Sequence, residues 1–351
     1  MSWEDNIRKV VPYVAGEQPK DRNIIKLNTN ESPYPPSPLV AEAVKNIETD
    51  QLRKYPDTNA TELVEEMAKT YGVSKDNIFV GIGSDDVLAL AFLTYFNSDK
   101  QVIFPDITYS FYDVWAELYR IPYVTKPLDD DFNIIKEDYL CDNGGVVIAN
   151  PNAPTGAEMS IDAIEEIVRF NKDRVVIVDE AYVDFGATSA LPLIDRYDNL
   201  VVVQTFSKSR ALAGIRIGMA FGNPKIIGYL KDVKFSFNSY TLNPYTIAIG
   251  AAALKDREYY ADITAKTVKT RERMKNELKQ LGFTFADSKT NFIFAKHERL
   301  EAKDIFAALR AEGIYVRYFN KPRIDNYLRI SMGTDEQMDK MIAFLKGYIN
   351  G

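Results

Sequence analysis

Short apolar runs alternate with longer amphipathic stretches through the middle of the chain, from about residue 76 to residue 235. Many of the runs are rich in valine and isoleucine, which is typical of strands buried on both faces of a parallel sheet. The predicted strands cover residues 77–83, 101–105, 145–150, 174–180, 200–206 and 216–222. Helices are predicted between them at 84–96, 109–118 and 160–171, with Ser84 and Ser160 as N-caps. This alternation predicts an α/β fold with a mostly parallel sheet covered by helices.

The pattern changes after about residue 243. A long helical region is predicted over 244–281, followed by short strands near 283–286, 291–295, 314–318 and 327–331 and helices at 303–312 and 335–348. The sequence "TDEQ" at 334–337 is a capping box that begins the last helix. Residues 12–38 are rich in proline and asparagine and predict an irregular arm. We therefore expect an arm (1–35) packed with the small domain, a large domain (36–243) and a smaller α/β domain (244–351).

Length and charge narrow the class of protein. A chain of 351 residues is too long for one hydrophobic core, which agrees with two domains. The net charge is −7 and no basic run stands out, so neither nucleic acid nor an anionic membrane is the expected partner. The single cysteine, Cys141, excludes an intrachain disulfide, and residues 1–15 lack the apolar core of a signal peptide. We expect a cytoplasmic protein.

The chain contains one histidine, His297. A multi-histidine zinc site is therefore excluded, and no metal site is expected. His297 lies in the charged stretch "FAKHERL", with no nucleophile patterned near it, so we expect it at the surface. If the protein is an enzyme, its acid–base group is then a lysine, a tyrosine or a carboxylate.

The turn after the first strand candidate reads "GIGSDD". A glycine-containing turn that opens a helix presents free N–H groups to an anion such as phosphate. The dinucleotide fingerprint G-x-G-x-x-G fails, because Asp86 stands at its third glycine position. Taken alone, the turn is better explained as a capped helix that carries acidic residues in its first turn.

Three charged residues lie next to the ends of other strand candidates: Asp179, Lys208 and Arg216. Each alone has a simpler explanation, a salt bridge within the fold for Asp179 and Arg216 and a solvated surface position for Lys208. Together with the glycine turn they form a set that suits pyridoxal 5′-phosphate. A lysine forms a Schiff base with its aldehyde, a carboxylate keeps its ring nitrogen protonated, and a helix N-terminus with an arginine holds its phosphate.

The same residues carry a resemblance to a known family. The stretch "TFSKSRALAGIRIG" resembles the S-K-x-x-x-L-A-G-x-R-x-G segment of fold-type I aminotransferases, and "PNAPTG", "DEAY" and "GSDD" resemble its other motifs in order. Among these enzymes the chain is most similar to the histidinol-phosphate aminotransferases, through "LNTNESPYPP", "RKYPD", "DITYSFY" and "YLRISMGT". The resemblance covers about residues 12–345.

This resemblance implies roles for individual residues. Lys208 is the Schiff-base lysine and proton carrier, Asp179 pairs with the ring nitrogen, and Tyr182 bonds the ring 3′-oxygen. Tyr55 reaches the phosphate in the neighbouring subunit of a homodimer. The remaining implied cofactor contacts are Gly83, Ser84, Asp85, Tyr109, Asn152, Ser207 and Arg216. Of these, Tyr109 stacks on the ring, while Ser84 and Asp85 act through backbone N–H groups.

One motif departs from the family pattern. The asparagine that usually precedes P-T-G is replaced by Ala153, and the nearest asparagine is Asn152. Either Asn152 reaches the ring through a shifted backbone, or Tyr182 holds the 3′-oxygen without it.

Two arginines in apolar strand patterns, Arg317 and Arg329, point to an anionic substrate, because an unpaired buried guanidinium is costly. They suit the phosphate of histidinol phosphate and the carboxylate of glutamate or 2-oxoglutarate. Tyr13 and Asn28 are further substrate-binding candidates.

Other functions remain open at this point. An aromatic amino acid aminotransferase or a decarboxylase of a phosphorylated amino acid shares nearly all the cofactor motifs. A regulatory module that binds pyridoxal phosphate without turnover is disfavoured, because the acidic chain has no room for a DNA-binding domain. An NAD oxidoreductase is disfavoured by the missing glycine.

Overall fold

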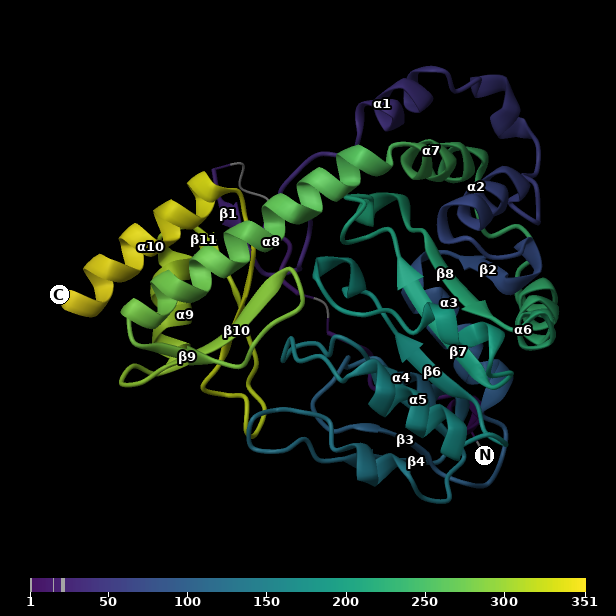
Figure 1. Cartoon of the computed structure of the whole chain (residues 1–351), viewed down its shortest axis with the longest axis horizontal. Helices are drawn as coiled ribbons and strands as arrows, with labels where there is room; N and C mark the ends of the chain where they lie inside the picture. Colours follow the sequence, from purple (N-terminus) through teal and green to yellow (C-terminus); the bar gives the residue numbers. More distant parts are fainter. Residues whose placement is uncertain (1, 15, 20–22) are drawn as a thin grey trace.

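Seven strands form the central sheet of the larger domain in this computed structural model, which describes residues 2–14, 16–19 and 23–351 (Figure 1). Their order is β2-β8-β7-β6-β5-β3-β4, and all run parallel except β8, which is antiparallel to both of its neighbours. The strands are β2 (Ile78–Gly81), β3 (Val102–Pro105), β4 (Tyr123–Lys126), β5 (Gly145–Ala149), β6 (Val176–Asp179), β7 (Leu200–Thr205) and β8 (Gly218–Gly222). The α/β class and the mostly parallel sheet are confirmed; β4 was not predicted.

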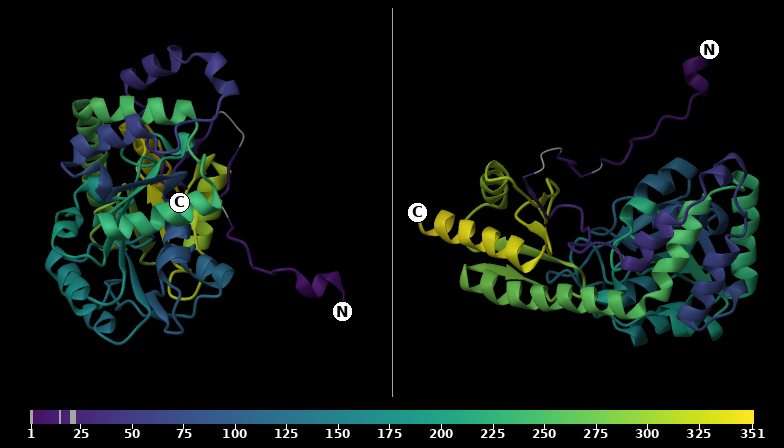
Figure 2. Two further views of the ribbon diagram at one scale, coloured as in Figure 1. Left: turned by 90° about the vertical axis from the view of Figure 1, so that its right-hand side faces the viewer. Right: turned by 90° about the horizontal axis from the view of Figure 1, so that it is seen from above.

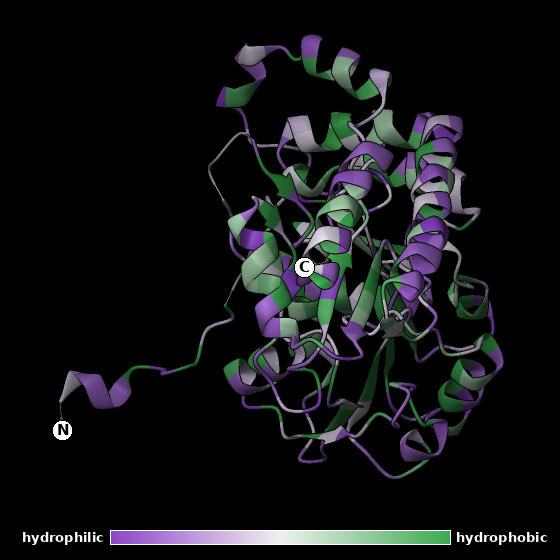
Figure 3. Ribbon diagram, turned by 90° about the vertical axis from the view of Figure 1, so that its left-hand side faces the viewer, coloured by the Kyte–Doolittle hydropathy of each residue, from purple (hydrophilic) through white to green (hydrophobic). Residues whose placement is uncertain are grey.

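Helices cover both faces of this sheet, so its strands are apolar on both sides. In β5, Val146 and Ile148 pack toward one layer of helices, whereas Val147 and Ala149 pack toward the other. The first layer contains α1 (Pro38–Lys45), α2 (Thr61–Tyr71), α5 (Ile161–Phe170) and α7 (Pro244–Lys255). The second contains α3 (Gly83–Tyr95), α4 (Tyr112–Tyr119) and α6 (Pro224–Phe237). Figure 3 shows hydrophobic strands inside and hydrophilic outer helix surfaces.

Two helix starts test the predicted N-caps. Ser160 caps α5 as expected, because its hydroxyl accepts a hydrogen bond from the Ala163 N–H at 3.3 Å. The Ser84 prediction is wrong: α3 begins one residue earlier, at Gly83, and Ser84 lies in its first turn. The N-cap residue is Ile82, whose own N–H donates to the Asp86 carboxylate at 2.9 Å.

The smaller domain contains a four-stranded antiparallel sheet in the order β12-β13-β10-β9. Its elements are β9 (Phe283–Phe285), β10 (Phe292–His297), α9 (Ala302–Ala311), β12 (Arg317–Tyr318), β13 (Leu328–Ser331) and α10 (Asp335–Asn350). The capping box at Thr334 and Gln337 is present at the start of α10. The long helix α8 (Arg257–Gln280) joins this domain to the larger one (Figure 1).

The predicted boundary between the large and small domains, at residue 244, lies before the position at which the packing changes from one core to the other. The region 244–281 forms two helices, α7 and α8, rather than one. α7 packs on α1 and α2, and Tyr260 and Ile263 of α8 belong to the same core. Met274 and Leu278, farther along α8, pack in the core of the smaller domain. The passage between domains therefore lies within α8.

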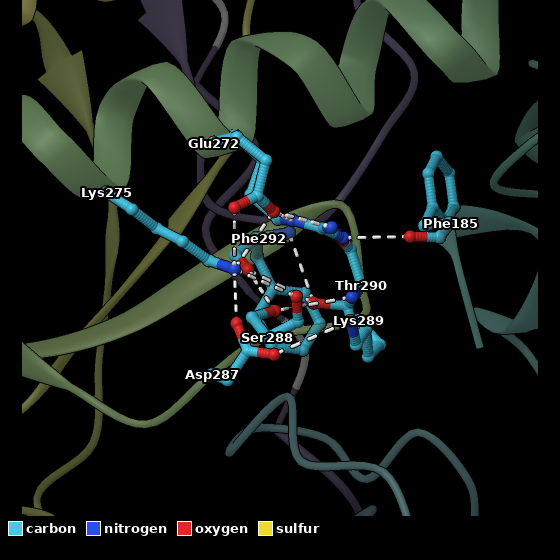
Figure 4. A network of polar contacts seen from close by, with 9 residues as sticks. Phe185, Glu272, Lys275, Asp287, Ser288, Lys289, Thr290 and Phe292 are labelled. Carbon is cyan, nitrogen blue, oxygen red and sulfur yellow. Dashed lines mark hydrogen bonds and ion pairs between the residues drawn. The ribbon is translucent and has the colours of Figure 1, made fainter.

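A network of polar side chains stabilises the part of α8 that connects the two domains (Figure 4). We call it the junction network, and it comprises Arg271, Glu272, Lys275, Asp287, Ser288 and Thr290. Buried Arg271 donates to the carbonyl oxygens of Phe185 in the larger domain (2.9 Å) and Thr290 in the smaller one (2.7 Å). Lys275 donates to the carboxylates of Glu272 (2.9 Å) and Asp287 (2.5 Å). These bonds tie α8 to both domains.

The N-terminal segment contacts both domains, whereas the prediction assigned it to the smaller one. β1 (Ile25–Lys26) pairs in parallel with β11 (Ile314–Tyr315) of the smaller domain. Tyr13 instead stacks on Phe111 of the larger domain, with ring centroids 4.1 Å apart. The first residues of the segment project from the body of the molecule (Figure 2). Residues 1, 15 and 20–22 of the predicted arm lie outside the described residues.

The prediction for His297 is wrong, because this side chain is only 3% exposed. It ends β10, where its Nδ1 accepts the N–H groups of Arg299 and Leu300 at 3.1 and 3.0 Å. Its Nε2 lies 2.9 Å from the carbonyl oxygen of Leu281. The prediction failed because it relied on the charged residues next to His297 in the sequence. The side chain itself is buried, and its hydrogen bonds stabilise the turn that follows β10. Among the described residues, no helix has the length and apolar character needed to cross a membrane.

Candidate active site

A cavity of about 230 Å³ opens at the edge of the sheet where β6 and β7 end. Polar side chains gather there because the carboxyl ends of parallel strands meet at one edge. β8 contributes to the same edge with its first residues, since it runs antiparallel and Gly218 pairs with Thr205. The predicted residues that line this cavity are Ser84, Asp85, Tyr109, Asp179, Tyr182, Ser207, Lys208 and Arg216.

One end of the cavity is formed by the start of α3 and by Arg216. Gly83 has a φ of +82°, and a Cβ at this position would lie 2.5 Å from an Arg216 guanidinium nitrogen. Glycine therefore lets the guanidinium lie against the helix N-terminus. Arg216 donates to one Asp85 carboxylate oxygen at 3.1 Å, and the Tyr109 hydroxyl donates to the other at 2.7 Å. The first-turn N–H groups and the guanidinium together form a site suited to a phosphate.

Asp179 ends β6 and is 5% exposed. Its Oδ2 accepts the Tyr112 hydroxyl at 2.8 Å, and its Oδ1 accepts the Ala181 N–H at 3.2 Å. Burial raises the pKa of this carboxyl to about 6, although both hydrogen bonds act in the opposite direction. No ion pair reaches it within the described residues. A cationic group bound in the cavity would stabilise its charged form.

Lys208 follows β7 and directs its amine into the same cavity. Its Nζ donates to the carbonyl oxygen of Thr29 at 3.2 Å and lies 5.6 Å from the centre of the Tyr182 ring. It takes part in none of the ion pairs between described residues. The Tyr182 hydroxyl accepts a hydrogen bond from the Asn30 side chain at 2.8 Å. Counting described residues alone, the amine has one protein acceptor and further hydrogen-bonding capacity.

Asn152 does not line the cavity, although Ala153 does. Its side-chain nitrogen donates to the Ile107 carbonyl oxygen (2.9 Å) and the Thr155 hydroxyl (3.0 Å). Its oxygen accepts the Thr108 hydroxyl at 2.7 Å. The side chain is fully buried and holds the loop together. This geometry favours the second alternative for the altered motif, in which Tyr182 acts without Asn152.

A second cavity of about 420 Å³ adjoins the first and shares Tyr109, Tyr182 and Lys208 with it. All four predicted substrate-binding residues line it: Tyr13, Asn28, Arg317 and Arg329. Its walls come from the N-terminal segment and from both domains.

The second cavity has a strongly cationic wall. Arg329 donates to the Asn28 carbonyl oxygen at 3.0 Å, while its Nε has no hydrogen-bond partner among the described residues. Desolvation lowers the pKa of this guanidinium, and the nearby Arg317 lowers it further. Neither arginine takes part in an ion pair among the described residues. Two adjacent guanidinium groups without carboxylate partners suit an anionic ligand.

Tyr55 lines neither cavity. It is 81% exposed and stacks on Tyr240, with ring centroids 4.5 Å apart. The structure therefore presents this tyrosine on the outer surface of the chain.

Several residues at the site were missed by the sequence analysis: Thr29, Asn30, Tyr112 and Thr205. Asn30 and Thr29 lie within the "LNTNES" motif, where only Asn28 was chosen. Tyr112 follows Tyr109 by three residues, a spacing that places two aromatic side chains on one side of a helical turn. Its carboxylate partner is distant in sequence, so no local pattern reveals their contact.

The family model for aminotransferase class I and II matches residues 22–345. The chain belongs to this family. The aminotransferase is 50% identical to the histidinol-phosphate aminotransferase of Lactococcus lactis subsp. cremoris over 349 residues, which are 99% of this chain and 98% of the relative. It is 51% identical to that of Brachyspira hyodysenteriae over 343 residues, 97% of each chain.

Solved structures agree with this assignment. The aminotransferase superposes on histidinol-phosphate aminotransferase from Sinorhizobium meliloti in complex with pyridoxal-5′-phosphate with a TM-score of 0.83 and 26% identity. The superposition covers 94% of this chain and 92% of that one. The enzyme from Clostridium acetobutylicum gives a TM-score of 0.85 at 22% identity, covering 93% and 99%, and shows the same fold. The predicted fold-type I aminotransferase architecture is confirmed.

Proposed function

We propose that this chain is a pyridoxal-phosphate-dependent aminotransferase of histidine biosynthesis. It converts L-histidinol phosphate and 2-oxoglutarate to imidazole-acetol phosphate and L-glutamate. The names of relatives about half identical over the whole chain support this substrate. The structural observation that carries it is the pair Arg317 and Arg329, which line the second cavity and have no carboxylate partner in the described ranges 2–14, 16–19 and 23–351.

The residues of the first cavity fit the cofactor. The Gly83–Arg216 contact leaves an anion site at the start of α3, buried Asp179 calls for a cationic partner, and Lys208 has hydrogen-bonding capacity to spare. When bound, pyridoxal phosphate supplies an aldehyde carbon and a ring that accepts electrons. Arg216 and Ser207 bind its phosphate, with the N–H groups of Ser84 and Asp85. Tyr109 covers one face of its ring.

Protons are controlled by three residues of the same cavity. Asp179 holds the proton at the ring nitrogen, because its carboxylate is buried and prefers a cationic partner. Tyr182 donates to the ring 3′-oxygen while Asn30 donates to its own hydroxyl oxygen. Lys208 would take the proton from the α-carbon of the amino donor and deliver it to the former aldehyde carbon of the cofactor.

The second cavity binds the rest of the substrate. Arg329 and Arg317 bind the phosphate of histidinol phosphate, and the same guanidinium groups bind the distal carboxylate of glutamate. Asn28 and Tyr13 contact the substrate from the N-terminal segment. Glutamate and histidinol phosphate therefore use one cavity in turn.

We further propose that the enzyme is a cytoplasmic homodimer in which Tyr55 reaches the phosphate site of the neighbouring subunit. The exposed position of Tyr55 and its stacking on Tyr240 agree with a role outside its own chain. Tyr55→Phe should weaken retention of pyridoxal phosphate about tenfold by removing one charge-assisted hydrogen bond. Equal retention by this variant, measured by equilibrium dialysis, would refute the contact.

A substrate panel on protein loaded with pyridoxal phosphate tests the proposed reaction. We expect the highest kcat/KM with histidinol phosphate and 2-oxoglutarate, compared with phenylalanine and threonine phosphate as donors. A preference for phenylalanine would replace the substrate with an aromatic amino acid, and release of CO₂ from threonine phosphate would make the protein a decarboxylase. A wild-type protein that loses all pyridoxal phosphate on dialysis would refute the cofactor assignment.

A further inference from the structure

Tyr112 is the single side chain among the described residues that hydrogen-bonds Asp179. It is fully buried at the first residue of α4, and its hydroxyl lies 2.8 Å from Asp179 Oδ2. Within the part of the chain that the structure describes, the only other donor to this carboxylate is the Ala181 N–H, at 3.2 Å from Oδ1. The residue does not line the cavity, so it acts on a ligand only through Asp179.

The direction of this hydrogen bond is set by burial. Desolvation raises the pKa of Tyr112 well above its ordinary value, and the Asp179 charge raises it further. Tyr112 therefore keeps its proton and donates it to the carboxylate. A hydrogen bond donated to a carboxylate favours the charged form of that group.

The other charged groups around Asp179 do little to keep it ionised. Asp85 of α3 raises the pKa of Asp179, and Lys208 lowers it, so these two oppose each other. Burial is the largest effect, and the Tyr112 hydroxyl opposes it most strongly. The uncharged hydroxyls of Tyr109 and Tyr182 line the same cavity.

We propose that Tyr112 is a positioning residue for the cofactor: its hydroxyl holds the Asp179 carboxylate in place and keeps it ionised, so that the carboxylate can pair with the ring nitrogen. The inference rests on the proposed function. With a proton shared between Asp179 and the ring nitrogen, a less basic carboxylate leaves the proton on the nitrogen. Loss of the hydroxyl makes Asp179 more basic and draws the proton toward the carboxylate, which weakens the ring as an electron acceptor.

The turn from Tyr109 to Tyr112 contacts both Asp179 and Asp85, the carboxylate beside the proposed phosphate site. Tyr109 donates to Asp85, which also accepts from Arg216 at the phosphate end, and Tyr112 donates to Asp179 at the nitrogen end. One short segment therefore donates hydrogen bonds to two carboxylates that line the same cavity.

The surroundings of Tyr112 make a clean substitution possible. Its ring packs against Phe92, Phe104 and Trp115, with centroid separations of 6.1, 5.8 and 6.3 Å. Tyr112→Phe keeps this packing and removes only the hydroxyl. Tyr95→Phe is the matched control, since the Tyr95 hydroxyl donates to the Ile226 carbonyl oxygen at 3.0 Å on the same side of the sheet, away from the cavity.

Three measurements on the full-length protein test the inference. In Tyr112→Phe we expect pyridoxal phosphate to dissociate about tenfold more readily, as for loss of a hydrogen bond to a charged group. We also expect kcat to fall more than KM rises, and the pH titration of the cofactor's absorption to shift. Tyr95→Phe should match the wild type in all three.

A double-mutant cycle with Asp179→Asn separates positioning from a general structural effect. If Tyr112 acts through Asp179, Tyr112→Phe adds less than about twofold to cofactor loss in the Asp179→Asn background. An undiminished tenfold effect in that background, or wild-type binding and titration in the single variant, would overturn the inference. Failure of wild type and Tyr95→Phe to bind pyridoxal phosphate would instead refute the proposed function, and with it the basis of the inference.

Discussion

The junction network and the cavity at the sheet edge both contain cationic side chains that are buried or half-buried, yet these side chains use their hydrogen bonds differently. Arg271 has partners in Phe185, Thr290 and Glu272, and Lys275 contacts two carboxylates. In the cavity, Arg329 and Lys208 each donate to a single carbonyl oxygen. Burying charge is costly unless the group is paired. In the junction network, partners within the protein pair the buried charges. In the cavity, the cationic groups keep hydrogen-bonding capacity that a ligand can use.

The largest expected effect separates activity from stability at Lys208. Lys208→Ala should lower kcat about 10⁴-fold, because it removes the group that moves the α-carbon proton. The free energy of unfolding of the cofactor-free protein should change by less than about 1 kcal/mol, since only one hydrogen bond to a carbonyl is lost. Steady-state kinetics and urea unfolding measure the two. A kcat within tenfold of wild type would exclude Lys208 as the catalytic lysine.

Replacing one arginine of the junction network and one of the cavity wall by methionine should give different losses of stability. Arg271→Met should lower the free energy of unfolding by about 3 kcal/mol, because it leaves two buried carbonyl oxygens without donors. Arg329→Met should lower it by no more than about 1 kcal/mol, because an incompletely paired cation is also removed.

For catalysis the order should be reversed: the substitution with the smaller effect on stability should have the larger effect on KM. Arg329→Met should raise KM for histidinol phosphate about 10- to 100-fold through loss of charge-assisted hydrogen bonds. Arg271→Met should leave KM near that of wild type while the protein is folded. Equal destabilisation by the two substitutions would contradict the distinction between the regions.

A pH dependence follows from Glu180, a buried carboxyl next to Asp179. Burial raises its pKa from 4.5 to about 7, although Ser189, Ala190 and Gln204 donate to it. The folded state therefore keeps a proton that the unfolded chain releases. Stability falls as pH rises toward about 7, and it does not fall further from this cause above that pH.

For the cofactor-free protein we expect the free energy of unfolding to fall by about 2 kcal/mol between about pH 5 and pH 7. Asp179, with its pKa raised to about 6, contributes in the lower part of this window. Glu180→Gln should reduce the slope, as should bound pyridoxal phosphate through Asp179. Denaturant unfolding at several pH values measures the slope, and a rise in stability over this window would contradict the prediction.

The smallest effect concerns a neutral member of the junction network. The Ser288 hydroxyl contacts Thr290 Oγ1 at 2.8 Å and the Phe292 carbonyl oxygen at 2.7 Å. Ser288→Ala should lower the free energy of unfolding by about 1 kcal/mol and leave kcat and KM unchanged. An effect as large as that of Arg271→Met would mean that the network fails as a unit.

The sequence predicted the large sheet well because its strands are short apolar runs with clear ends. β4 was missed because it lies at the sheet edge, and its residues are exposed or half-buried. The domain division was misplaced because α7 and α8 both appear helical, and a helical pattern does not reveal which core a helix joins. His297 was misplaced because its burial depends on Leu281 and the following turn rather than on its charged neighbours.

For the site, the sequence predicted residues at strand ends, and the structure brings most of them together in one cavity. Lys208, Asp179 and Arg216 could be proposed from the sequence because charged residues next to apolar runs are easily noticed, and all three line the cavity. Tyr112 and Asn30 were missed because aromatic and amide side chains beside other polar residues are not. Their importance rests on contacts over long sequence separations, with Asp179 and Tyr182.

The reversed direction of β8 has a consequence for how this chain can vary. Lys208 and Arg216 lie on the one connection between β7 and β8, whose ends are fixed by the pairing of Thr205 with Gly218. The separation between amine and guanidinium is therefore set by the length of a single loop. An insertion or deletion here would alter the size of ligand that both groups can hold at once, whereas changes in length at the far edge of the sheet would not. This connection is expected to tolerate substitution more readily than a change in length.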